Sequence, residues 1–168
     1  MIVIYTGEGK GKTSACMGQA VRALGQDLAV GFVQFMKQPD AGGEQKTLAN
    51  LLGDRFFTAG GKGFFRTEEQ RAEHRAAALA SLARARALIE DMDLLVLDES
   101  VYALGAGLIT REEMDSLVAT ARRRNMHLVL SGRGVPQWLL DEADLVSEIA
   151  AVKHPFTKGL PAVKGIDF

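Results

Sequence analysis

The sequence predicts an α/β domain built on a mainly parallel sheet that is flanked by helices. Three observations support this fold class: short apolar runs alternate with helical patterns, LLVLD (Leu94–Asp98) is almost continuously aliphatic, and a glycine-rich turn joins the first strand to the first helix. A strand that is covered on both faces gives such a continuous run. Strands alternating with helices are typical of parallel βαβ units.

The expected elements follow in order along the chain. We expect strands at residues 2–5, 28–35, 56–57, 94–98, 127–131 and 145–152, and helices over about 12–24, 67–89 and 110–124, with a short one after Pro136. Two of the helices start at capping boxes, Thr67-Glu-Glu-Gln70 and Thr110-Arg-Glu-Glu113. The segment 36–63 carries two glycine pairs, so we expect it to be irregular around one short strand.

Composition limits the class of protein. The chain has 168 residues, is 47% hydrophobic and 24% charged, and carries a net charge of −1, so we expect one domain over residues 1–168. The near-neutral charge argues against generic nucleic-acid binding, and no apolar run approaches the ~20 residues of a membrane span. The single cysteine, Cys16, excludes an intramolecular disulfide and fits a reducing compartment, so we expect a cytoplasmic protein.

The glycine-rich turn TGEGKGKTSA (residues 6–15) has the Gly-Lys-Thr ending of a phosphate-binding loop. The usual pattern G-x-x-x-x-G-K-[ST] needs its first glycine at Thr6, whereas here the first glycine is Gly7, so the loop is one residue short. Glycines let backbone N–H groups curl around an anion, and the helix that follows presents its positive end to it. We therefore predict a nucleotide-binding loop.

The side chains of this loop supply the expected chemistry. Lys12 would bridge phosphate oxygens, Thr13 would offer its hydroxyl to Mg²⁺, and Lys10 adds a positive charge that a triphosphate can use. The predicted ATP-binding residues of the loop are Gly7, Glu8, Gly9, Lys10, Gly11, Lys12, Thr13 and Ser14.

Two further strand ends carry candidate site residues. Asp98 and Glu99 follow the aliphatic strand as in a Walker B element, which delivers a carboxylate to the metal directly or through water. Arg133 stands between two glycines after the next strand and is a candidate phosphate contact, or else an ordinary loop arginine. Ligands of parallel sheets bind beyond the carboxyl ends of the strands, so these residues are expected to share one rim with the loop.

Aromatic residues of the irregular stretch are candidates for an apolar ligand wall. Phe64 and Phe65 stand between Gly63 and Arg66, outside any helix or strand pattern. His74 stands among charged residues of the following helix, and we expect it at the surface.

Several stretches, in this order, resemble the P-loop ATP:corrinoid adenosyltransferases of cobalamin salvage. They are TGEGKGKTSA, VGFVQFMK (30–37), Gly63-Phe64, LLVLDES (94–100), LSGRGVP (130–136), EADLVSEI (142–149) and the tail VKHPFTKGLPAVKGIDF (152–168). The tail is the most specific of them, because general P-loop ATPases have nothing like it.

The resemblance implies a RecA-like P-loop fold and a reaction in which Co(I) of a corrinoid attacks the 5′ carbon of ATP and expels triphosphate. On this basis the candidate catalytic residues are Lys12, Thr13 and Glu99, and Mg²⁺ or Mn²⁺ would be held by Thr13, Asp98 and Glu99, directly or through water. Phe64 and Phe65 would contact the corrinoid. The resemblance also implies a homodimer and a reductant partner of the flavoprotein type.

Two other functions stay open on the sequence. A nucleotide-dependent corrinoid-binding or regulatory module would bind both ligands without turnover. A small-molecule kinase would use Asp98 or Glu99 to deprotonate an acceptor hydroxyl. The short loop argues against the kinase, since a cradle with an added lysine suits a protein that retains the triphosphate and gives away the adenosyl group.

Overall fold

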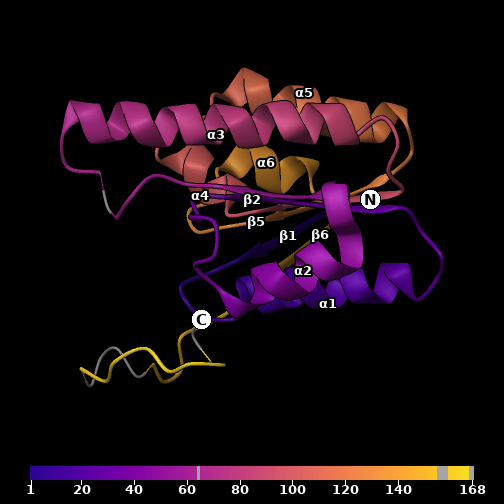
Figure 1. Cartoon of the computed structure of the whole chain (residues 1–168). Helices are drawn as coiled ribbons and strands as arrows, with labels where there is room; N and C mark the ends of the chain where they lie inside the picture. Colours follow the sequence, from indigo (N-terminus) through magenta and orange to yellow (C-terminus); the bar gives the residue numbers. More distant parts are fainter. Residues whose placement is uncertain (64, 155–158, 167–168) are drawn as a thin grey trace.

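The computed structural model describes residues 1–63, 65–154 and 159–166, and its centre is a six-stranded sheet (Figure 1). The strand order is β3-β2-β4-β5-β1-β6, and every neighbouring pair is parallel. The strands are β1 (Ile2–Thr6), β2 (Val30–Phe35), β3 (Phe56–Ala59), β4 (Leu94–Asp98), β5 (His127–Ser131) and β6 (Leu145–Glu148). The α/β fold with a parallel sheet is therefore confirmed.

Helices cover both faces of the sheet (Figure 1). They are α1 (Lys12–Leu24), α2 (Gly43–Leu52), α3 (Glu68–Leu88), α4 (Ser100–Gly105), α5 (Arg111–Arg123) and α6 (Gln137–Glu142), with a 3₁₀ turn, η1, at Gly53–Arg55. α1 and α2 lie on one face, and α3, α4, α5 and α6 lie on the other. None of the helices in the described part of the chain is long and apolar enough to cross a membrane.

Two hydrophobic cores fill the spaces between the sheet and these helix layers. Alternate residues of β4 divide between them: Leu95 and Leu97 join the core under α3 and α5, whereas Leu94 and Val96 join the core under α1. Side chains of a strand point alternately to its two faces. The strand is therefore aliphatic at each of its first four positions, up to Asp98, because both of its faces are buried.

Both predicted capping boxes are present. The Thr67 hydroxyl accepts from the Gln70 N–H at the start of α3, and the Thr110 hydroxyl accepts from the Glu113 N–H at the start of α5. In each case the side chain of the third helical residue accepts from the backbone N–H of the capping threonine. These bonds satisfy donors that a helix start would otherwise leave unpaired, so the sequence located both helix starts within a residue.

Two helices and some boundaries differ from expectation. α2 lies in the stretch expected to be irregular: the glycine pair marks its start, and Leu48 and Leu52, one turn apart, are buried against the sheet. α4 begins directly after Glu99, whose left-handed backbone (φ 58°) turns the chain out of β4. β6 ends at Glu148, four residues before the expected end, because the chain there turns to pack on the phosphate loop.

Candidate functional site

The phosphate loop is held in shape by backbone contacts with the segment after β6. The N–H of Gly9 donates to the carbonyl of Ile149 at 2.7 Å. A Cβ atom on Gly9 would lie 2.6 Å from the carbonyl oxygens of both Ile149 and Ala150, which no side chain tolerates. Gly11, at φ 125°, adopts a backbone that favours glycine and leads into α1. The shortened loop is thus a packed turn whose glycines are required by close approach and by conformation.

Lys12 closes this loop on itself. Its ammonium donates to the carbonyl oxygens of Gly7 at 2.7 Å and Gly9 at 2.8 Å, and the residue is only 6% exposed. Burial lowers the pKa of Lys12, while the charge of Glu99 acts in the opposite direction. The Lys12 ammonium is thus satisfied by two carbonyl oxygens of the loop, at the place where phosphate oxygens would be its acceptors.

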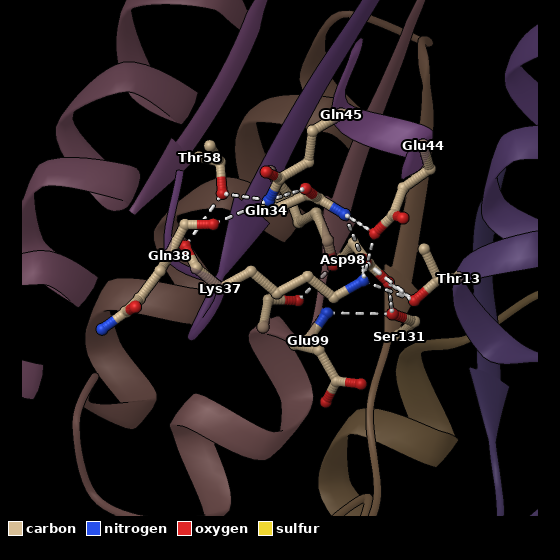
Figure 2. Close-up of polar contacts among 12 residues, drawn as sticks. Thr13, Gln34, Lys37, Gln38, Glu44, Gln45, Thr58, Asp98, Glu99 and Ser131 are labelled. Atoms are coloured by element: carbon tan, nitrogen blue, oxygen red, sulfur yellow. Dashed lines mark hydrogen bonds and ion pairs between the residues drawn. The ribbon is translucent and has the colours of Figure 1, made fainter. Parts of the chain in front are cut away.

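Asp98, at the end of β4, is the centre of a buried hydrogen-bond network (Figure 2). Its carboxylate accepts from the Ser131 hydroxyl at 2.7 Å, from the Thr13 hydroxyl at 3.1 Å and from the Gln34 amide at 3.1 Å. The Ser131 oxygen in turn accepts from the N–H of Glu99 at 2.9 Å. The parallel sheet brings these groups together because the carboxyl ends of β2, β4 and β5 and the start of α1 meet at one edge.

Lys37 and Glu44 belong to the same network, and neither was predicted from the sequence as a site residue. The Lys37 ammonium lies 2.9 Å from the Thr13 hydroxyl, 3.1 Å from a carboxylate oxygen of Glu44 and 3.1 Å from one of Asp98. Burial alone would lower the pKa of Lys37, but the charges of Asp98 and Glu44 outweigh it, and the pKa is raised. The stretch VGFVQFMK ends at this lysine, and a cation at a strand end was the signal available in the sequence.

Glu99 is next to this network without joining its side chain to it. In Figure 2 its carboxylate points away from Thr13, Lys37 and Asp98. Burial is the main cause that raises the pKa of Glu99, and the neighbouring charge of Asp98 adds to it. Of the three predicted metal ligands, the structure therefore groups Thr13 with Asp98 and leaves the Glu99 carboxylate apart.

Arg133 lies over the phosphate loop. Its guanidinium is 3.2 Å from the Glu8 carboxylate and donates to the Glu8 carbonyl at 3.4 Å. The preceding Gly132, at φ 142°, lies so close to the backbone of α4 that a Cβ atom would be 2.4 Å from the N of Tyr102. The glycines flanking Arg133 thus allow the chain to turn sharply and bring the arginine to the loop.

Two cavities meet at this edge of the sheet. The first, of about 570 Å³, is lined by loop residues 9–14 and by Lys37, Glu44, Glu99 and Arg133, among others. The second, of about 380 Å³, is lined by Lys12, Met36, Gly63, Phe65, His74, Glu99, Tyr102 and Arg133. Lys12, Glu99 and Arg133 line both, so ligands in the two cavities would lie on either side of one shared wall.

His74 is buried in the second cavity, and the expectation that it lies at the surface was wrong. It is 2% exposed, and neither ring nitrogen has a hydrogen-bond partner among the described residues. It begins the buried stripe of α3 that continues through Ala78 and Leu82, and this spacing of four was the signal that could have identified it. The ring of Phe65 packs against it with centroids 5.1 Å apart. Phe64, the other predicted aromatic contact, lies outside the described residues.

Comparison with known proteins identifies close sequence relatives. The family model of ATP:corrinoid adenosyltransferase BtuR/CobO/CobP matches residues 1–168. The chain is 36% identical to a corrinoid adenosyltransferase of Pseudomonas aeruginosa, covering 100% of this chain and 83% of that protein. It is 37% identical to the corrinoid adenosyltransferase CobA of Salmonella typhimurium, covering 100% of this chain and 85% of that protein.

Solved structures with low sequence identity share the fold. The flagellar accessory protein FlaH of Methanocaldococcus jannaschii matches with a TM-score of 0.56 at 16% identity, over 88% of this chain and 69% of that one. The genome packaging NTPase B204 of Sulfolobus turreted icosahedral virus 2, solved with ATP-gammaS, matches with a TM-score of 0.54 at 14% identity, over 92% of this chain and 77% of that one. These proteins therefore share the α/β fold with a parallel sheet that was expected from the sequence.

Proposed function

We infer that this chain, which belongs to the ATP:corrinoid adenosyltransferase family, transfers the 5′-deoxyadenosyl group of ATP to Co(I) of a corrinoid and releases triphosphate. The observation that carries this function is the match of the family along residues 1–168, together with two relatives of the same name at 36% and 37% identity. The chain is accordingly a transferase, and its substrates are ATP and a corrinoid.

The geometry of the phosphate loop supports a role in holding the leaving group. In this reaction the bond between C5′ and the α-phosphate oxygen breaks, and the whole triphosphate departs with the bonding electron pair. The Lys12 ammonium would exchange the carbonyls of Gly7 and Gly9 for phosphate oxygens, and Lys10 lines the same cavity. Charges placed where negative charge accumulates are often the largest single contribution to catalysis.

The oxygen atoms around Lys37 are suited to Mg²⁺ or Mn²⁺. No cluster of three His, Cys, Asp or Glu side chains occurs in the described ranges, so a metal ion would depend on the Thr13 hydroxyl, single carboxylates and the nucleotide. Mg²⁺ is commonly held in this way, by one or two carboxylates, water and substrate phosphates. Thr13, Asp98 and Glu44 would hold it, with Glu99 acting through water. The chemistry supplied by such an ion is neutralisation of the triphosphate charge.

The second cavity is the proposed place of the corrinoid edge that faces the nucleotide. It shares Lys12, Glu99 and Arg133 with the first cavity, so a substrate there would be adjacent to bound ATP. Phe65 supplies an apolar surface on its wall, and Phe64 is proposed to act with it. No side-chain nucleophile is required, because cobalt is the attacking atom.

Three further properties belong to this proposal and depend on the resemblance. They are a homodimer, a flavoprotein-type reductant that generates Co(I), and a cytoplasmic location. Light scattering on the purified protein would measure the oligomeric state, and reduction assays with purified flavoproteins would test the electron donor.

One assay tests the central proposal. The protein is incubated anaerobically with MgATP and a chemically reduced corrinoid, and both the corrinoid spectrum and the phosphate product are followed. We expect adenosylcorrinoid and triphosphate in equal amounts. ADP as the product would indicate a kinase or an ATPase, and binding of both ligands without turnover would indicate a carrier.

A further inference from the structure

The ammonium of Lys37 lies at a position that suits a metal ion. Three oxygen atoms surround it at 2.9–3.1 Å, and they come from three different elements: Thr13 from α1, Glu44 from α2 and Asp98 from the end of β4 (Figure 2). A hydroxyl and two carboxylates, arranged around one point, form a typical oxygen donor set for a hard divalent cation.

These carboxylates require a positive charge between them. The side chain of Asp98 is fully buried and that of Glu44 is about four-fifths buried, and both contact the same ammonium. The amide of Gln34 lies 3.1 Å from Asp98 and 3.4 Å from Glu44, which further restricts where the two carboxylates can point. Without a cation, two like charges in a site of low dielectric constant would repel each other and move apart.

We propose that Lys37 is a positioning residue that keeps Thr13, Glu44 and Asp98 in place by occupying the cation site with its own ammonium until a nucleotide-bound divalent cation displaces it. The inference rests on the proposed function in so far as the displacing cation arrives with ATP. Lys37 also lines the nucleotide cavity, so its displaced ammonium can contact the triphosphate. The exchange maintains charge balance, because the triphosphate supplies the negative charge that the second cation requires.

A specific consequence concerns the protein without nucleotide. An ammonium among these oxygens repels a divalent cation at the same place, and nothing is present to accept the lysine. The nucleotide-free protein should therefore bind Mn²⁺ weakly, although its donor set is already assembled. Removing the ammonium while keeping the stem of the side chain should convert the same three residues into a binding site for the bare metal ion.

The test measures Mn²⁺ binding to the full chain in the absence of nucleotide, using loss of the electron paramagnetic resonance signal of free Mn²⁺. We expect Lys37→Met to bind one Mn²⁺ about ten-fold or more tightly than the wild type, because one repelling charge is lost. Lys46→Met, on the exposed side of α2, is the matched control and should behave as the wild type. Adding Asp98→Asn to Lys37→Met should abolish the gain, which would locate the ion at this site.

Thermal unfolding gives a second readout, which covers the case in which Lys37→Met is unstable. The variant should melt at a lower temperature than the wild type in a chelator, and Mn²⁺ should restore most of the loss while leaving the wild type unchanged. Destabilisation without rescue by Mn²⁺, or equal Mn²⁺ affinity in wild type and variant, would overturn the inference. Because no corrinoid is used, such a result would leave the adenosyl-transfer proposal intact, and that proposal is tested separately by its products.

Discussion

The first and second cavities differ in how the polar groups around them are paired. The first cavity is the nucleotide side of the wall that the two share. On the nucleotide side, Lys12, Lys37 and Asp98 are all paired with protein oxygens or donors. On the other side, His74 is also buried, at 2% exposure, but its two ring nitrogens have no partner in the described ranges. Leaving a buried polar side chain unpaired costs about 1–3 kcal/mol. The charged groups on the nucleotide side are thus paired within the protein, whereas the other side contains a buried imidazole without a partner among the described residues.

The difference has a chemical reason. A triphosphate site concentrates cations and carboxylates, and unpaired charges in a protein interior are far more costly than unpaired neutral groups. Charges on the nucleotide side therefore have to pair with one another when ATP is absent. The comparison can be tested by removing charged groups on one side and the imidazole on the other.

The largest expected effect is on activity, from Lys12→Ala. Its ammonium is proposed to neutralise the departing triphosphate, and loss of one such donor typically lowers the rate about 10²–10³-fold. Adenosylcorrinoid formation at limiting ATP measures the effect, with Lys46→Ala as the exposed control. If Lys12→Ala kept full activity while folding normally, the assignment of the loop as the triphosphate site would be wrong.

The next effect is on stability, from Asp98→Ala. Removing this buried carboxylate leaves the Ser131 hydroxyl without its acceptor and takes away one of the two carboxylates that pair with the Lys37 ammonium. Breaking a buried ion pair in this way costs about 3–5 kcal/mol, so the free energy of unfolding in urea should fall by that order. Asp115→Ala is the matched control, because its ion pair with Arg111 is exposed and contributes at most about 1 kcal/mol. Similar losses in both variants would mean that the Asp98 network is not buried as described.

The nucleotide side was also the part that the sequence predicted best. The phosphate loop and Asp98 belong to local patterns, each a fixed spacing at the end of an apolar strand, so the chain itself places them at one rim. Lys37 contacts Thr13, Glu44 and Asp98 only because the sheet order puts β2 beside β4 and because α2 forms in a glycine-rich stretch. The spacing of residues along the chain does not predict such contacts between separate elements.

The second cavity was predicted less well because the sequence patterns of its residues are weak. α3 is rich in alanine and arginine, and alanine occurs on both its buried and its exposed positions, so the helix shows little contrast between its faces. The buried stripe at His74, Ala78 and Leu82 is visible only when the spacing of four is sought. The charged neighbours of His74 in the sequence point to the other faces of the helix, and they suggested the wrong environment.

A paired experiment on α3 tests the unpaired histidine, with effects of about 1 kcal/mol. His74→Leu replaces two unpaired buried nitrogens by an apolar group of similar size, so the free energy of unfolding should rise by about 1 kcal/mol. Ser81→Ala, on the same helix, removes a buried hydroxyl that donates to the Gln34 carbonyl at 3.2 Å and should cost about 1 kcal/mol. Opposite signs are expected in urea unfolding. A clear loss of stability in His74→Leu would show that the ring nitrogens have partners in solution.

The smallest expected effect is on the pH dependence of stability, and it comes from an ion pair away from the site. Glu113 of α5 accepts from Arg75 of α3 at 2.9 and 3.0 Å, and its own helix cap adds the Thr110 N–H at 2.7 Å. The hydrogen bonds to Arg75 are the main cause that lowers the pKa of Glu113 below its ordinary value of 4.5. A carboxyl with a lowered folded pKa stabilises the protein above its unfolded pKa, and this contribution is lost as the pH falls through the folded pKa.

The stability that Glu113 adds should therefore be constant near neutral pH and decrease below pH 4.5. Glu113→Gln keeps the shape of the side chain but cannot ionise, so its difference in unfolding free energy from the wild type should shrink in acid. Arg75→Met should reduce the same pH dependence from the other partner. A difference between wild type and Glu113→Gln that stays unchanged from pH 7 to well below pH 4.5 would show that the α3–α5 contact does not depend on this charge.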